Sequence, residues 1–288
     1  MTSTTSVATT ATLPAVTPVR EPVLRGVGIA LVLLGAFVLG FAGYLYGLSG
    51  VQEGRDQSVL FEKLQLELAN QVAPLGPTTM GAPVAILEIP AIGVRNLVVV
   101  EGTSPESLSH GPGLLRDTPL PGQAGVSEIF GRRATFGAPF ARLAQLRPGD
   151  VIQAITGQGT STYRVAATGS SRQAINDPAP DRLVLLTASS PVIPSYYVDV
   201  DARLTSAASP GPAIPPVIGA SELPLAGDTG VLGLVMVWGE ILVLVSVAGT
   251  IAMVRWARWP AYLVIAPVLL AVLWNLYQAL AMVLPNVY

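Results

Sequence analysis

The sequence predicts an all-β domain that is held at a membrane by three apolar helices. Only 12% of the 288 residues are charged and 51% are hydrophobic, whereas an ordinary soluble domain is about a quarter charged. The middle of the chain consists of short β-like runs separated by glycine and proline, a pattern typical of a β-barrel or β-sandwich. The composition therefore indicates a membrane protein, and the spacing of the turn residues indicates an all-β fold for the middle of the chain.

Three apolar runs, at residues 26–48, 229–254 and 259–284, are long enough to span a bilayer, which takes about 20 helical residues. The first run carries no charge and is longer than the apolar part of a secretory signal peptide. We therefore expect an uncleaved anchor, with a cleaved signal peptide as the alternative. Residues 1–25 before it are rich in Ser, Thr, Ala and Pro and predict a disordered cytoplasmic tail.

Positive charge predicts how these spans are oriented. Arg20 and Arg25 precede the first run, and Arg255 and Arg258 lie between the second and the third. Because cytoplasmic connections are enriched in arginine and lysine, both clusters are expected in the cytoplasm. Residues 49–228 and the end of the third span then face the outside.

Three polar residues fall within the last two spans: Glu240, Asn275 and Gln278. Polar groups at that depth usually face protein rather than lipid. A hydrogen bond between the second and third helices is the expected reading. The alternative is a contact with the first span or with another membrane subunit.

The outward segment begins with residues 49–83, where Leu60, Leu64 and Leu68 have helical spacing and predict a juxtamembrane helix followed by a linker. We expect short helices near residues 104–110 and 139–145. Residues 205–228 are rich in Pro and Ala and predict an extended, mobile tether. Strands are expected at residues 84–89, 96–101, 125–130, 151–156, 160–167, 183–187 and 196–204.

The segment 84–204 resembles the sortases. The similar stretches are ILEIPAIGV (86–94), VVVEGT (98–103), GPG (111–113), LPGQAG (120–125) and FGRRATFGAPFARLAQLRPGD (130–150). The resemblance is closest to the actinobacterial housekeeping type, class E. It implies an eight-stranded barrel of the kind found in membrane-anchored cysteine transpeptidases, which join secreted proteins to the cell envelope.

The three residues that carry sortase chemistry are replaced in this chain. By the register of the resemblance, Arg132 stands in place of the histidine, Ser189 in place of the cysteine and Tyr197 in place of the arginine. A register shifted by one residue would put Ala188 at the cysteine position. The chain has no Cys at all, and an arginine cannot cycle a proton as a general base. We therefore expect no catalytic residues here.

Other candidate residues remain open to two readings. Arg132 and Arg133 could bind a carboxylate, or form ion pairs with Glu128 or Asp150. The single histidine, His110, is expected near a turn, at the surface or capping the short helix before it. With one His and no Cys, no metal site or cofactor is predicted.

The leading hypothesis is a non-catalytic sortase-like protein that binds or scaffolds at the outer membrane face, beside an active sortase or a secreted sorting-signal protein. One alternative is a hydrolase or transpeptidase that depends on Ser189. Another is a subunit of a membrane complex that acts mainly through its helices. The net charge of −2 gives no reason to expect a nucleic-acid partner.

Overall fold

The computed structural model describes residues 20–288, apart from 174, 176, 192–193, 215–217 and 256–257. The chain divides into two compact units, Met1–Ala42 and Gly43–Tyr288. Most of the tail expected at residues 1–25 thus lies outside the described residues. Its last part, however, belongs to helix α1 (Arg20–Gly43). Pro22 does not prevent this, because proline is tolerated in the first turn of a helix.

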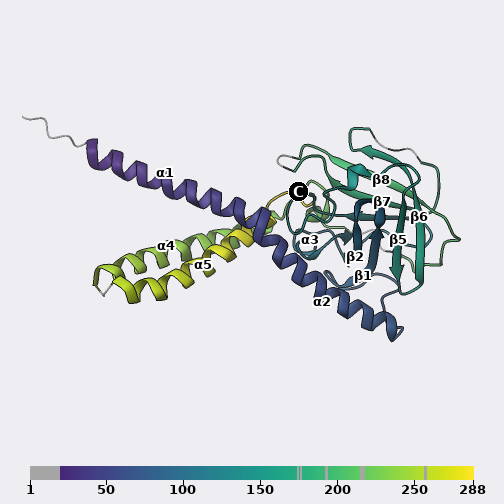
Figure 1. Ribbon diagram of the computed structural model, residues 1–288, viewed down its shortest axis with the longest axis horizontal. Helices are drawn as coiled ribbons and strands as arrows, with labels where there is room; N and C mark the ends of the chain where they lie inside the picture. The colour runs from purple at the N-terminus through teal and green to yellow at the C-terminus, as the bar shows by residue number, and fades with distance from the viewer. Residues whose placement is uncertain (1–19, 174, 176, 192–193, 215–217, 256–257) are drawn as a thin grey trace, which may run out of the picture. The chain divides into compact units, whose positions relative to one another are not determined.

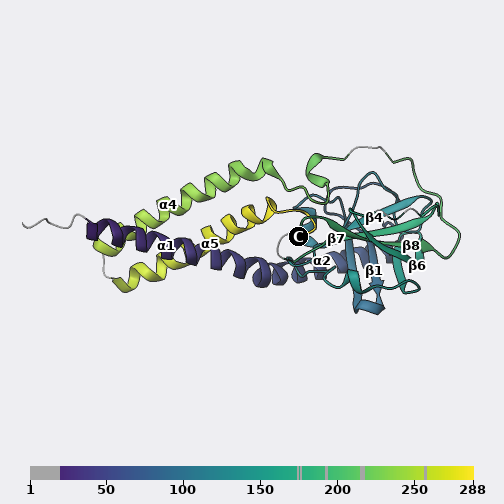
Figure 2. The same ribbon diagram turned by 90° about the horizontal axis from the view of Figure 1, so that it is seen from above.

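Three helices among the described residues are long and apolar enough to cross a membrane: Leu24–Ala69, Thr229–Met253 and Leu263–Met282. The second and third coincide with α4 (Leu232–Arg255) and α5 (Arg258–Met282). These two lie side by side in both views (Figures 1 and 2). A Cβ at Gly249 would lie 2.9 Å from Ile265 Cγ2, so the absence of a side chain lets the two helices approach closely.

The outward segment is a closed barrel with the strand order β1-β2-β3-β4-β7-β8-β6-β5. The eight-stranded barrel that the sequence predicts is thus confirmed. Its strands are β1 (Pro83–Ile89), β2 (Val94–Glu101), β3 (Gly113–Leu114), β4 (Val126–Phe130), β5 (Val151–Thr156), β6 (Gly159–Ser170), β7 (Arg182–Ala188) and β8 (Tyr197–Leu204).

Alternation of apolar side chains builds the barrel interior. In β5, buried Ile152, Ala154 and Thr156 alternate with half-buried neighbours, the two-residue period of a strand. Sequence periodicity missed only β3, because two residues are too few to show a period. Of the two short helices expected, the first is α3 (Ser107–His110) and the second is a 3-10 turn, Leu143–Gln145. Another 3-10 turn, Pro90–Ile92, joins β1 to β2.

Helix α2 (Ser49–Ala69) packs along the barrel after a π-helical turn, Tyr44–Leu48. Leu64 is fully buried in a cluster with Ile86 and Val98 of β1 and β2. The Gln57 side chain bonds both backbone groups of Val98, donating to its oxygen at 3.0 Å and accepting from its nitrogen at 2.8 Å. The juxtamembrane helix is thus part of the folded domain (Figure 1).

The segment 205–228, predicted as a mobile tether, lies against the barrel where the structure describes it. Ser209 exchanges backbone hydrogen bonds with Gly122 and Ala124. A 3-10 turn, Ala220–Glu222, places Glu222 2% exposed, and a second, Thr229–Val231, leads into α4. Proline and alanine make the segment extended, but backbone pairing and one buried carboxylate dock it.

Candidate functional site

The C-terminal ends of β4 and β7 and the start of β8 meet at one place. β4 and β7 are parallel, with Phe130 opposite Leu186. Just beyond that pair, Gly131 N donates to Leu186 O and Thr187 Oγ1 donates to Gly131 O, both at 2.9 Å. Adjacent β8 begins at Tyr197, which pairs with Ala188. The segments around Gly131 and Thr187 are therefore in direct contact.

The positions matched to the sortase triad, Arg132, Ser189 and Tyr197, all follow or begin these strand ends. We call this region the β4–β7 site. It also includes the apolar cluster on the outer face of the two strands. That cluster consists of Leu108, Leu115, Phe130, Leu186, Ala188 and Val287.

Arg132 is fully buried, and its guanidinium donates three hydrogen bonds to uncharged groups. Nε donates to Leu108 O at 3.1 Å and Nη2 to Pro105 O at 3.1 Å. Nη1 donates to Thr135 Oγ1 at 3.4 Å, and the ring of Phe136 lies 4.6 Å from the guanidinium carbon. This side chain fastens the end of β4 to the segment around α3.

Burial lowers the pKa of Arg132 to about 10, with neighbouring Tyr44 acting against that shift. The group still carries its proton at neutral pH, so it cannot accept one from a nucleophile. In the described part of the chain, the suggested ion pairs with Glu128 and Asp150 are not formed. An outside carboxylate could reach this guanidinium only by displacing its present partners.

Arg133 and Ser189 both neighbour Ala188, the last residue of β7. Arg133 Nη1 donates to Ala188 O at 3.0 Å, and Ser189 N donates to Tyr196 O at 3.0 Å. The Ser189 hydroxyl oxygen is buried and has no hydrogen-bond partner among the described residues. A hydroxyl becomes a useful nucleophile only beside a base, and none of the described contacts supplies one.

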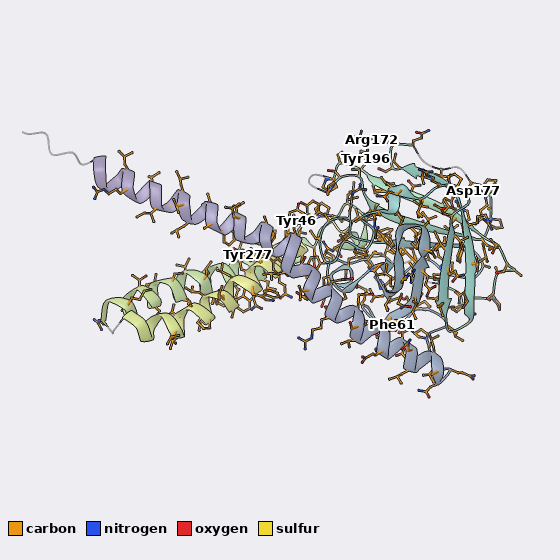
Figure 3. All side chains as sticks on the ribbon, in the orientation of Figure 1. Tyr46, Phe61, Arg172, Asp177, Tyr196 and Tyr277 are labelled. Atoms are coloured by element: carbon orange, nitrogen blue, oxygen red, sulfur yellow. The ribbon has the colours of Figure 1, made fainter. Side chains whose placement is uncertain are left out.

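The two tyrosines at the start of β8 are packed aromatics. The guanidinium carbon of Arg172 lies 4.3 Å from the ring centre of Tyr196, at the edge of the barrel (Figure 3). Tyr197 packs against the apolar cluster of the β4–β7 site. Burial raises the pKa of Tyr197, so its hydroxyl stays neutral at physiological pH.

Carboxyl groups accumulate on the same strands. Glu128 and Asp201 flank Val184 in neighbouring strands, and Arg182 Nη1 donates to Asp201 Oδ2 at 2.6 Å. Burial raises the pKa of Glu128, Asp199 and Asp201, while Arg182 acts against the shift at Asp201. Negative charge here disfavours an acidic ligand.

His110 ends α3 and faces α2 rather than the β4–β7 site. Its Nδ1 lies 2.7 Å from Asp56 Oδ2, and its backbone oxygen accepts from Gln57 Nε2 at 2.8 Å. This agrees with the turn-region, partly exposed position that the sequence indicates. A Ser189–His110 pair is not among the described contacts.

A cavity of about 600 Å³ lies between α2, the α3 region and helices α4 and α5. Asn275 and Gln278 both line it. Asn275 Nδ2 donates to Ala271 O of its own helix at 2.8 Å, and Gln278 Nε2 donates to Gln52 Oε1 at 3.3 Å. Gln278 thus contacts Gln52 near the start of α2, beyond residues 26–48. Its contact with the first span stays a prediction.

Glu240 is exposed on α4. Its carboxyl group forms no hydrogen bond or ion pair with another described residue. The hydrogen bond to α5 that the sequence favours is therefore not among the contacts of the described residues. Contact with another membrane subunit stays a prediction for this residue.

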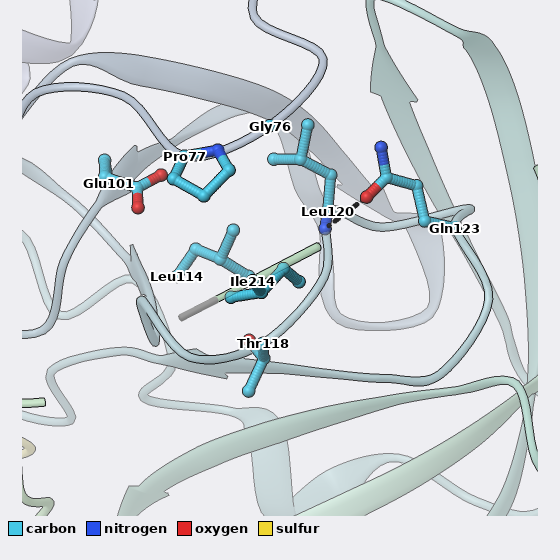
Figure 4. Close-up of a pocket in the computed structure, with 8 residues that line it drawn as sticks. All are labelled: Gly76, Pro77, Glu101, Leu114, Thr118, Leu120, Gln123 and Ile214. Atoms are coloured by element: carbon cyan, nitrogen blue, oxygen red, sulfur yellow. Dashed lines mark hydrogen bonds between the residues drawn. The ribbon is translucent and has the colours of Figure 1, made fainter. Parts of the chain in front are cut away.

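A second, much smaller cavity of about 10 Å³, room for about one water molecule, lies beside Glu101 at the end of β2 (Figure 4). Glu101 is 2% exposed, and its Oε2 is buried without a partner in the described residues. Burial raises its pKa to about 7, with Arg116 lowering it and Glu222 raising it further.

No group of three or more His, Asp or Glu that could hold a metal ion occurs among the described residues.

Comparison with known proteins supports one family. Residues 87–204 match the family model of the sortase domain. Sortase D of Bacillus subtilis (strain 168) is 33% identical over 106 residues. The barrel of this chain is therefore similar to the sortase domain, and the similarity lies within residues 87–204. The match covers 37% of this chain and spans about half, 51%, of that relative.

Solved sortases resemble the barrel. Sortase E from Streptomyces avermitilis is 31% identical, with 45% of this chain and 91% of that chain covered and a TM-score of 0.39. A sortase D5 transpeptidase from Clostridium perfringens is 19% identical, with 53% and 99% covered and a TM-score of 0.45.

Sequence reasoning missed one part of the β4–β7 site of this sortase-like domain. Residues 284–288, which follow α5, reach the site, where Asn286 and Val287 are fully buried. Their signal in the sequence is slight, since a Leu-Pro-Asn-Val-Tyr run after an apolar helix reads as the end of a span. Contact between segments about 100–150 positions apart cannot be read from local patterns.

Proposed function

We propose that this chain is a non-catalytic member of the sortase family. In this reading the barrel is a binding or scaffolding module, anchored in the membrane, that takes part in cell-envelope protein sorting or assembly. An active sortase or a secreted sorting-signal protein would be its partner. The actinobacterial, class E-like character of the chain belongs to the same proposal.

The main support for this proposal is that Arg132 is buried, protonated and hydrogen-bonded to neutral groups. Acyl transfer by a side chain needs a nucleophile and a neighbouring group that takes and returns a proton. The position matched to the histidine holds a buried, protonated guanidinium that donates to Leu108, Pro105 and Thr135. The chain has no cysteine, and the one histidine is bonded to Asp56.

The membrane helices supply the anchor in this proposal. The arginine clusters favour a cytoplasmic N-terminal end, with residues 49–228 and the end of α5 outside. The barrel would then stand on the outer face, where secreted proteins arrive. This placement is what a scaffolding partner of an envelope enzyme requires.

A serine-reactive fluorophosphonate probe tests the proposal on the purified, detergent-solubilised full chain. We expect no labelling above that of the Ser189→Ala variant, because no base activates the hydroxyl. The same preparation should leave a sorting-signal peptide intact by mass spectrometry. An active sortase serves as the positive control for cleavage.

Ser190→Ala is the matched control, since it alters the neighbouring hydroxyl. Labelling that persists in Ser190→Ala and disappears in Ser189→Ala would establish a serine enzyme and refute the proposal. So would cleavage of the peptide that is lost in Ser189→Ala alone.

A further inference from the structure

Residues 284–288 form a compact turn that is built into the β4–β7 site. Tyr288 N donates to Pro285 O at 3.0 Å and closes the turn. The Val287 side chain, 0% exposed, completes the apolar cluster with Leu108 and Phe130. Helix α5 ends at Met282, so only a few residues separate the membrane helix from the site.

The backbone of the turn satisfies donors at both strand ends. Val287 O accepts from Arg133 N, which follows β4, and from Ala188 N, the last residue of β7, each at 3.2 Å. Without the turn, both N–H groups would lose this acceptor and would need water or another acceptor in its place. The strand ends are therefore shaped for a main-chain carbonyl with an apolar side chain beside it.

Further contacts hold the turn from the opposite side. Asn286 Nδ2 donates to Ser221 O at 2.5 Å and to Leu223 O at 2.8 Å. Asn286 N donates to Ala226 O at 2.8 Å. Thr135 Oγ1, which also accepts from Arg132, donates to Tyr288 O at 3.0 Å. The turn thus joins segment 205–228 to the residues around the replaced triad.

The hydroxyl groups of Tyr46 and Tyr288 connect the turn to the segment that follows β7. Tyr288 Oη lies 2.6 Å from Tyr46 Oη, and Tyr46 Oη donates to Pro191 O at 3.2 Å. Pro191 follows Ser189 by two residues. The turn 284–288 and the π-helical turn Tyr44–Leu48 therefore lie against the segment that carries the serine.

We infer that residues 284–288 are a built-in ligand of the β4–β7 site, which closes the site to peptides from outside. The inference rests on the proposed function only in treating this site as the binding surface of the sortase domain. Because the turn directly follows α5, a partner that displaces this helix would also withdraw Val287. Access to the site is then controlled from the membrane part of the same chain.

A disulfide tests the occupancy directly, because the chain has no cysteine of its own. The full chain with Ala188→Cys and Val287→Cys, in detergent, is oxidised and digested, and linked peptides are identified by mass spectrometry. We expect the linked pair in most molecules. The matched control pair, Ala188→Cys with Leu263→Cys, places the second thiol near the start of α5 and should not link.

Exposure of the site gives a second readout. In Ala188→Cys alone, we expect slow reaction with a maleimide, and adding Val287→Asp should raise the rate about tenfold or more by favouring local opening. Adding Leu225→Asp instead, at a residue 40% exposed, should leave the rate unchanged.

Two free, rapidly alkylated thiols in the folded Ala188→Cys, Val287→Cys chain would refute the inference. Equal maleimide rates with and without Val287→Asp would refute it as well. Neither result bears on Ser189, so a failure here is distinguishable from a failure of the proposed function, which shows as serine-dependent labelling.

Discussion

At the scale of single residues, two ionisable side chains, Arg132 and Glu101, are buried, where charged groups are seldom found. Arg132 replaces charge pairing with three hydrogen bonds to neutral groups. Glu101 lies beside a small cavity with one oxygen unpaired in the described residues. A buried charge without a partner is costly, so each group must either stay fully hydrogen-bonded or hold a proton.

The Glu101 side chain predicts a pH-dependent stability. Because burial raises its pKa from 4.5 to about 7, the folded protein holds this proton more tightly than the unfolded chain. Its contribution is fully present below about pH 4.5 and is lost as the pH rises through 7. Glu101→Gln, neutral at every pH, should therefore gain about 2 kcal/mol on the wild type between pH 5 and pH 8.

Melting curves of the detergent-solubilised chain at the two pH values measure this effect. We expect the difference in apparent melting temperature, variant minus wild type, to rise by about 5 °C from pH 5 to pH 8. Glu62→Gln, on the exposed side of α2, is the control. A constant difference for Glu101→Gln would contradict the assignment.

At the scale of elements, one ion pair docks the segment 205–228. Arg116 Nε and Nη2 donate to the two carboxylate oxygens of Glu222 at 2.9 and 2.5 Å. Gly219 N adds a third bond at 2.9 Å. Burial raises the pKa of Glu222, but these hydrogen bonds outweigh it and the pKa is lowered. The carboxylate is therefore the stable form of this contact.

Arg116→Ala should free this segment, because it leaves the Glu222 carboxylate, 3% exposed, without its cation. Loss of one partner from a largely buried pair costs about 2 kcal/mol after allowance for the partly exposed arginine. Limited proteolysis should then cut within residues 205–228 on the order of tenfold faster.

Arg95→Ala, at an exposed position of β2, is the matched control for loss of an arginine. The double variant Arg116→Ala, Glu222→Gln should be cut more slowly than Arg116→Ala, because no buried charge remains. An unchanged cleavage pattern in Arg116→Ala would show that backbone pairing alone holds the segment.

At the scale of the whole molecule, the proposed orientation can be read from single cysteines placed in a cysteine-free chain. Gln158→Cys, at an exposed end of the β5–β6 connection, should react in intact cells with a reagent that cannot cross membranes. Ala257→Cys, between α4 and α5 in the sequence, should react only after permeabilisation. The Ala257→Cys substitution keeps Arg255 and Arg258, the charges on which the predicted orientation depends.

The unmodified chain has no thiol and provides the background. Reaction of the Ala257→Cys variant in intact cells would reverse the orientation of α4 and α5. Reaction of neither variant until the cells are opened would place the barrel in the cytoplasm and exclude a role in the cell envelope.

Local patterns in the sequence were sufficient for every element with a clear period. Apolar stretches long enough for lipid specify α4 and α5, and short β-like runs bounded by turn residues specify strands such as β5 and β7. The eight-stranded barrel follows from the resemblance to sortases that stretches such as the run 130–150 carry. The absence of cysteine is a fact of composition, so the loss of thiol chemistry needed no coordinates.

Only the tertiary structure decided how distant segments meet. It turned the expected tether into a docked segment, left Glu240 exposed, buried Arg132 and carried residues 284–288 to the ends of β4 and β7. Each of these outcomes depends on whether another segment of the chain, often far away in the sequence, lies beside the residue. Periodicity describes a residue's own neighbours, whereas burial and hydrogen-bond satisfaction depend on what the folded chain brings beside it.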